Sequence, residues 1–168
     1  IMKKFALLLL IIVLVLLVVV VGRTLRVTSH RVSPEPFTPL AVDEAKAAES
    51  LAQVLRLETV SFQPGQVSKP EAFLALHRHF EQAFPRVHAT LTREAIADYS
   101  LLYTWKGADP SLKPIVLVAH QDVVPISPGS ESKWTHPPFA GQIADGFIWG
   151  RGALDDKASL VAILEAVE

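Results

Sequence analysis

The residues best suited to chemistry begin with a histidine and a carboxylate two positions apart, His120 and Asp122. They follow an apolar run, residues 114–119, which predicts a strand in the middle of a sheet covered on both faces. Positions i and i+2 of a strand point to the same side, and active sites of open α/β sheets collect at the carboxyl ends of strands. Asp122 could then accept the free ring N–H of His120 and leave the other nitrogen to bind a metal ion. A purely structural His–Asp pair is the competing interpretation.

A second cluster combines two glycines with two adjacent carboxylates, in the segment Gly150-Arg151-Gly152-Ala153-Leu154-Asp155-Asp156-Lys157. The glycines allow a tight turn after a predicted hairpin strand, residues 147–149. The carboxylates then begin an apolar helix, whose dipole favours negative charge at that end, so helix capping alone is sufficient to explain Asp156. The functional interpretation is that Asp155 bridges two metal ions, with one carboxylate oxygen on each. Taken alone, Lys157 is predicted to be a solvated helix residue.

The composition limits which chemistry is available. The 168 residues include no cysteine, which excludes disulfides, thiolate ligands and a cysteine nucleophile. Any metal site must therefore use His, Asp, Glu or backbone ligands. The formal net charge is −1, and no basic block indicates a nucleic-acid partner. Three other histidines are not expected to be ligands: His136 is flanked by Pro137, and His77 and His79 are predicted surface residues on different faces of one helix.

The N-terminus carries an unbroken apolar run from Phe5 to Val21, preceded by Lys3 and Lys4. As a helix this run spans roughly 25 Å, close to the roughly 30 Å hydrocarbon core of a bilayer. A cleaved signal peptide is the alternative, but it normally has a shorter run and a small-x-small cleavage site, which residues 22–26 lack. The run could also be a buried helix of a soluble protein, but such a helix would be unusual if it had no polar side chain at all. The run therefore predicts an uncleaved signal anchor, residues 1–22.

Basic residues flank this helix on both sides, with Lys3 and Lys4 before it and Arg23, Arg26 and Arg31 after it. The count alone slightly favours a cytoplasmic location for the residues that follow. We nevertheless expect the catalytic part to lie on the exported side of the membrane (periplasmic, extracellular or lumenal).

Residues 23–37 contain Pro34 and Pro36 and are predicted to be a semi-rigid linker. Thr38 is the predicted N-cap of a helix with Pro39 at its first position. The apolar stripe of that helix comprises Val42, Ala45, Ala48, Leu51, Ala52 and Leu55.

A capping box formed by Ser68 and Glu71 predicts the start of a second helix, which Pro85 ends. Its apolar face comprises Phe73, Leu76, Phe80 and Phe84. Alternating apolar residues over 87–91 predict a half-buried strand, and residues 101–105 predict another. Asp145-Gly146 is a strong signal for a two-residue hairpin turn. This order of helices, strands and hairpin, with a closing helix, predicts an α/β sandwich.

Three segments taken together point to one protein family more specifically than either cluster does alone. They are His120-Gln121-Asp122-Val123-Val124-Pro125, the loop with Trp134 and Pro137-Pro138-Phe139-Ala140-Gly141, and the run from Asp145-Gly146-Phe147 to Asp155-Asp156-Lys157. In this order they resemble the zinc aminoacylase/carboxypeptidase family, which includes acetylornithine deacetylase, succinyl-diaminopimelate desuccinylase, glutamate carboxypeptidase, carnosinase and carboxypeptidase S. The similarity runs from about residue 115 to the end, with weaker similarity near Ala45 and over residues 57–61. The loop and the apolar N-terminus are most similar to the membrane-anchored carboxypeptidase-S and N-acyl-amino-acid hydrolase branch.

The resemblance implies a role for each residue of the two clusters. His120 matches a ligand of one zinc ion, Asp155 matches the carboxylate that bridges two zinc ions, and Asp122 matches the catalytic acid that orients the histidine. Asp156 matches a position that need not be a ligand. Ala158 stands where many relatives have glycine, with little expected consequence in a helix. The implied fold is the N-terminal part of a mixed-sheet α/β sandwich zinc-peptidase catalytic domain, residues 38–168.

The resemblance also implies a function for the complete protein: a two-zinc amidohydrolase that cleaves a peptide or N-acyl-amino-acid amide next to a free carboxylate. The family requires a Glu-Glu pair, a later Asp or Glu, a distal His and an inserted lid or dimerisation domain. Glu165 and Glu168 do not fit that pair, so we expect this sequence to be an incomplete and inactive fragment, and any homodimer to form through the inserted domain. The alternatives are a deacylase or deacetylase of the same family, and a truncated, non-catalytic membrane protein.

Overall fold

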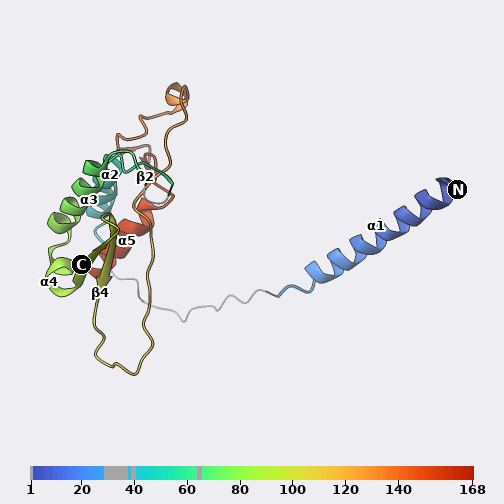
Figure 1. Ribbon diagram of the computed structural model, residues 1–168, viewed down its shortest axis with the longest axis horizontal. Coiled ribbons are helices and arrows are strands. Elements are labelled where there is room, and N and C mark those ends of the chain that lie inside the picture. The colour runs from blue at the N-terminus through green and yellow to red at the C-terminus, as the bar shows by residue number, and fades with distance from the viewer. Residues whose placement is uncertain (1, 29–37, 39–40, 64–65) are drawn as a thin grey trace. The chain divides into compact units, whose positions relative to one another are not determined.

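The computed structural model describes residues 2–28, 38, 41–63 and 66–168 (Figure 1). The chain divides into two compact units, Ile1–Leu40 and Ala41–Glu168. Most of the predicted linker, namely residues 29–37, lies outside the described residues, as does Pro39.

The described part of the first unit contains one helix, α1 (Met2–Thr24), of 23 residues, none of them buried. Its best 18-residue window has a mean hydropathy of 3.6, which makes it long and apolar enough to cross a membrane. A signal sequence near the N-terminus can satisfy the same criteria of length and composition. The observed helix is therefore compatible with both the anchor and the signal-peptide interpretations.

The second unit is built around four helices, α2 (Glu44–Leu55), α3 (Pro70–Ala83), α4 (Pro85–Thr90) and α5 (Lys157–Val167). Helix α5 lies beside α2 (Figure 1), and its residues Val161 and Leu164 are buried. The buried core cluster comprises Val54, Leu76, Phe80, Phe84, Val87, Val161 and Leu164. Burial of such side chains is the main favourable contribution to the stability of this unit.

Helix α2 begins later than the sequence predicts. Asp43 is the N-cap, and its carboxylate accepts a hydrogen bond from the backbone N–H of Lys46 at 3.0 Å. An aspartate at this position satisfies a helix-terminal N–H, so the expected start at Thr38 was wrong. Val42 consequently lies outside the helix and is 67% exposed. The C-terminal half of the stripe is as predicted, with Ala52 and Leu55 fully buried.

Helix α3 has the predicted apolar face but not the predicted capping box. Lys69 occupies the N-cap without a side-chain hydrogen bond, and Pro70 is the first helical residue. The predicted capping box was therefore wrong.

His77 is buried in α3, so the prediction that it is a surface residue was also wrong. It lies four residues after Phe73, on the same buried face, and is 4% exposed. Its Nε2 donates to the carbonyl oxygen of Tyr99 at 3.0 Å. Burial lowers the pKa of His77, and likewise the pKa of the half-buried His79.

The predicted strand at residues 87–91 is instead the short helix α4. Pro85 is at its first turn, and the Glu168 carboxylate accepts hydrogen bonds at 3.0 Å from the backbone N–H groups of Arg86 and Val87. These contacts satisfy N–H groups that a helix start leaves free, so tertiary context overrides the local alternation.

Three two-stranded antiparallel sheets complete the described part of the unit: β1 (Ser61–Gln63) with β2 (Gln66–Val67), β3 (Thr92–Ile96) with β4 (Ser100–Thr104), and β5 (Gln142–Ala144) with β6 (Phe147–Trp149). Strand β4 confirms the strand predicted at residues 101–105 to within one residue. The hairpin turn is confirmed as well, since Asp145 and Gly146 both have positive φ, 55° and 78°.

Residues 114–119 do not form the predicted central strand. They run as extended chain without a strand partner among the described residues (Figure 1), and Ile115 and Val118 are 88% and 78% exposed. An open groove of about 1130 Å³ separates this segment from β4 and α5. A strand needs a neighbour for its backbone hydrogen bonds and layers on its faces, and nothing in the described region supplies either. What the structure shows is a mixed α/β arrangement with small sheets.

Candidate metal centre

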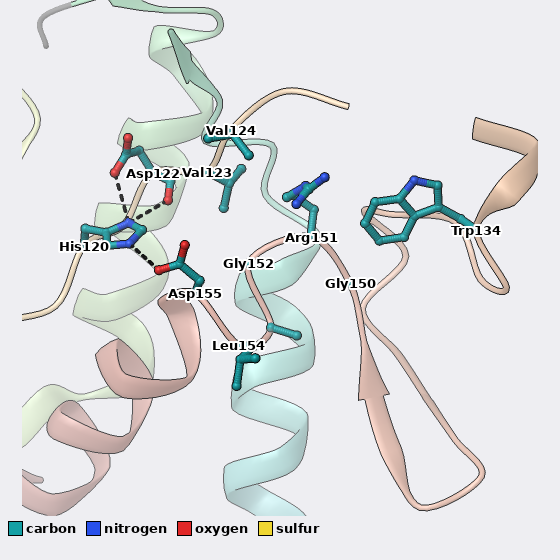
Figure 2. A pocket seen from close by; sticks show the side chains of 11 residues that line it. His120, Asp122, Val123, Val124, Trp134, Gly150, Arg151, Gly152, Leu154 and Asp155 are labelled. Carbon is teal, nitrogen blue, oxygen red and sulfur yellow. Dashed lines mark hydrogen bonds and ion pairs between the residues drawn. The ribbon is translucent and has the colours of Figure 1, made fainter. Parts of the chain in front are cut away.

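The structure brings together the three side chains singled out from the sequence, His120, Asp122 and Asp155 (Figure 2). The imidazole lies between two carboxylates, with Nδ1 3.2 Å from Oδ1 of Asp122 and Nε2 3.0 Å from Oδ1 of Asp155. Nδ1 is also 3.0 Å from the backbone oxygen of Asp122. The hydrogen bond with Asp155 is the largest cause that raises the pKa of His120; partial burial opposes it, and Asp122 adds to it.

Asp122 is held by a segment that comes from a distant part of the sequence. The Ser61 hydroxyl donates to Oδ2 of Asp122, and the Thr59 hydroxyl donates to the carbonyl oxygen of Gln121 at 2.6 Å. The backbone continues this pairing, because Val123 N–H donates to the Thr59 oxygen at 2.9 Å and Ser61 N–H to the Val123 oxygen at 3.1 Å. Sequence reasoning missed both hydroxyls, although the weak family similarity over residues 57–61 pointed to this segment.

Asp155 lies in the turn that joins β6 to α5. Gly152 has φ +88°, and a Cβ atom there would lie 2.5 Å from Cγ1 of Val123, so the turn requires glycine for both conformation and space. Asp156 occupies the N-cap position of α5, but its side chain makes no capping hydrogen bond. Its Oδ2 instead accepts from the backbone N–H of His120 at 3.4 Å. Asp156 is therefore the N-cap residue by position, as the capping interpretation predicts, although its carboxylate does not cap a helix N–H.

Lys157 is not the solvated residue that the sequence predicts. It is fully buried, at 0% exposure. Its Nζ donates to the carbonyl oxygens of Val54 at 3.0 Å and Leu57 at 2.8 Å. Burial lowers its pKa to about 8, against an opposing effect of the Asp122 charge. A signal was present in the sequence, since Lys157 stands four residues before Val161 on the buried face of α5.

A pocket of about 220 Å³ opens beside the three side chains. Its other wall includes Arg151 and Trp134, with the guanidinium carbon 5.0 Å from the indole ring centre (Figure 2). His136 packs edge-on against Trp149, with ring centres 4.9 Å apart. It does not line the pocket.

The donor chemistry of the cluster fits zinc, which binds imidazole nitrogen and carboxylate oxygen. His120 Nε2 and the Asp155 carboxylate face each other on one side of the imidazole, and Asp122 binds the opposite nitrogen. The described residues, however, contain no group of three or more His, Cys, Asp or Glu side chains arranged to hold a metal ion. His120 and Asp155 thus offer two of the four donors that tetrahedral zinc requires.

Comparison with known proteins places these features in a family. Residues 116–168 match Peptidase family M20/M25/M40. The chain is 45% identical over 154 residues to "Probable carboxypeptidase S-like 2" of Dictyostelium discoideum, covering 86% of this chain and 29% of that protein. It is 42% identical over 127 residues to "Carboxypeptidase S" of Saccharomyces cerevisiae, covering 71% and 22%. It is also 42% identical over 122 residues to "N-fatty-acyl-amino acid synthase/hydrolase PM20D1" of Bos taurus, covering 71% and 24%. The chain therefore spans less than a third of the length of each of these relatives.

Proposed function

Because the chain belongs to peptidase family M20/M25/M40, we propose that the complete protein is a two-zinc amidohydrolase. Its reaction is hydrolysis of a peptide or N-acyl-amino-acid amide bond next to a free carboxylate. In this proposal His120 would hold one zinc ion, Asp155 would be the carboxylate shared by the two ions, and Asp122 would orient His120. The observation that carries the proposal is the placement of one imidazole between two carboxylates, in the segment that matches the family.

We propose separate tasks for the two carboxylates. Asp122, held by Ser61, would keep a proton of His120 on Nδ1, and Nε2 would then be free to bind zinc in place of its hydrogen bond to Asp155. The Asp155 side chain is 90% exposed, which leaves its oxygens accessible to a ligand. Bound zinc supplies Lewis acidity, which polarises a carbonyl group and activates water near neutral pH. The general base, a glutamate in the family pattern, is proposed to come from the part of the complete protein that this chain does not cover.

The relatives include proteins named as a carboxypeptidase and as an N-fatty-acyl-amino acid synthase/hydrolase. We propose carboxypeptidase action first and N-acyl-amino-acid deacylation or deacetylation as the second candidate. Both reactions attack an amide carbonyl next to a residue with a free carboxylate, so the same zinc site serves either. A truncated, non-catalytic membrane protein is the remaining alternative, and the activity assay below would detect it by the absence of turnover.

For the N-terminal unit, we propose an uncleaved anchor at residues 1–22, a linker at 23–37 and an exported catalytic unit from residue 38. The support is α1, whose length and composition suit a membrane span. A reporter that is active on only one side of the membrane, fused after Arg31, tests the orientation. Activity of a cytoplasmic reporter at this position would contradict an exported catalytic unit, whether periplasmic, extracellular or lumenal.

Chelation and substrate choice test the function directly. We expect the complete protein to hydrolyse dipeptides with a free C-terminal carboxylate, and to lose roughly 100-fold or more of its activity after zinc is removed with a chelator. Added zinc should restore the activity. The control substrates are the same dipeptides with an amidated C-terminus, which should be poor. Acetyl- and long-chain-acyl-amino acids separate the two candidates. Activity that survives complete removal of zinc would exclude the proposal.

A further inference from the structure

The ammonium group of Lys157 is buried against main-chain carbonyl groups, not against a carboxylate. Its two hydrogen bonds go to Val54 and Leu57, at the C-terminal end of α2. The last carbonyl oxygens of a helix lack partners within the helix and carry its negative partial charge. A fully buried cation therefore closes the end of α2, and it does so from the first residue of α5.

The same lysine is tied to the turn that carries Asp155. Its backbone N–H donates to the carbonyl oxygen of Gly152 at 3.0 Å. Its side-chain stem passes 3.4 Å from the position that a Cβ atom of Gly152 would take. The backbone of Lys157 thus closes the turn from residue 152 to residue 156, and its side-chain stem lies beside Gly152.

The end of α2 leads, within a few residues, to the other half of the site. Leu57 accepts from the lysine through its carbonyl oxygen and also receives a hydrogen bond from Thr59 N–H at 2.9 Å. Thr59 and Ser61 then hold the chain around Asp122 through both hydroxyls and two backbone hydrogen bonds. A continuous series of hydrogen bonds therefore joins the Asp155 turn to Asp122.

We propose that Lys157 is a positioning residue of the metal centre, whose buried ammonium sets the distance between Asp155 and the His120–Asp122 pair by joining both to the end of α2. This inference rests on the proposed zinc function. Lys157 touches neither of the proposed ligands through its ammonium group, so it acts through the backbone that carries them. Residues that orient metal ligands typically contribute 10- to 100-fold to metal affinity, about the effect expected here.

The test uses the complete protein and its affinity for zinc, together with the absorption spectrum of the cobalt-substituted form as a record of ligand geometry. Lys157→Met keeps the stem and removes the donors. It should lower zinc affinity about 10- to 100-fold and change the cobalt spectrum. Lys157→Arg, which restores donors, should recover part of the affinity. The matched control is Lys46→Met, because Lys46 also links α2 to α5, through an ion pair at 3.7 Å between its exposed side chain and the partly buried Glu165; this variant should bind zinc normally.

A milder variant covers the case in which Lys157→Met does not fold. Ser61→Ala removes only the last hydrogen bond of the series, and it should lower zinc affinity about 10-fold with little loss of stability. If both variants bind zinc like the parent, with an unchanged cobalt spectrum, the inference is wrong while the proposed function stands. If the parent itself binds no zinc, the proposed function has failed first.

Discussion

Replacement of Asp155 by asparagine should lower the zinc affinity of the complete protein by more than about 100-fold, with little change in stability. The substitution keeps the shape of the side chain but removes its charge and one of its two acceptor oxygens. Because the Asp155 side chain is 90% exposed, its loss leaves no buried group without a partner. Zinc affinity measured by competition with a chelating dye, beside a urea unfolding curve, checks both parts of this expectation.

Asp145→Asn is the matched control for that experiment. Asp145 lies in the hairpin turn before the Asp155 segment, with φ 55°, a conformation that asparagine tolerates well. This variant removes the same charge from a neighbouring turn and should bind zinc like the parent. Equal losses in the two variants would mean that overall charge, not ligation by Asp155, governs the affinity.

Gly152→Ala is expected to have the largest effect on the fold around the site. Its φ of +88° is unfavourable for any residue with a Cβ atom, and the new methyl group would lie 2.5 Å from Cγ1 of Val123. Backbone strain and overpacking together should destabilise the folded state by roughly 2 to 5 kcal/mol. Because Val123 follows Asp122 directly, relief of the clash would also displace that carboxylate and weaken zinc binding.

Gly146→Ala separates the effect of backbone strain from the effect of overpacking. Gly146 also has a positive φ, +78°, but nothing lies within 4 Å of the position of its Cβ. This variant should lose only about 1 kcal/mol of its free energy of unfolding, from the unfavourable backbone conformation, and it should keep its zinc affinity. Urea unfolding curves of the two variants give the difference directly. Equal destabilisation would show that the Gly152 site has room for a methyl group.

Features that depend on local chemistry could be predicted from the sequence. The Asp145-Gly146 turn demands positive φ at both positions, and few sequences other than this pair satisfy that requirement easily. The closing helix α5 and the buried face of α3 follow from the spacing of their apolar residues. The proximity of His120, Asp122 and Asp155 also agrees with expectation, although their proposed zinc roles stay predictions.

Features that depend on distant neighbours could not be predicted. The alternation over residues 87–91 suits a strand, but the Glu168 carboxylate, at the far end of the sequence, accepts from the first N–H groups of a helix there. The apolar run at 114–119 has strand composition, yet its pairing depends on neighbours that the described structure does not contain. In both cases the local pattern was clear, and the presence of a tertiary partner in the first and its absence from the described residues in the second decided the outcome.

The supporting residues of the site were missed for a related reason. A lysine at a helix start is usually solvated, and only the carbonyl groups at the end of α2 make burial of Lys157 favourable. Ser61 likewise has no local reason to be important, because its partner Asp122 is far away in the sequence. Residues that hold ligands in place are recognised by their three-dimensional contacts, and sequence spacing contains little information about them.

The central claim is that His120 and Asp155 are zinc ligands and that Asp122 is not. A crystal structure of the complete zinc-bound protein, with anomalous scattering recorded at the zinc edge, tests it most directly. We predict two zinc peaks about 3.5–4 Å apart, one of them about 2.1 Å from Nε2 of His120, with Asp155 oxygens about 2.0–2.2 Å from both. Zinc bound away from His120 and Asp155, or bound directly by Asp122, would contradict the account.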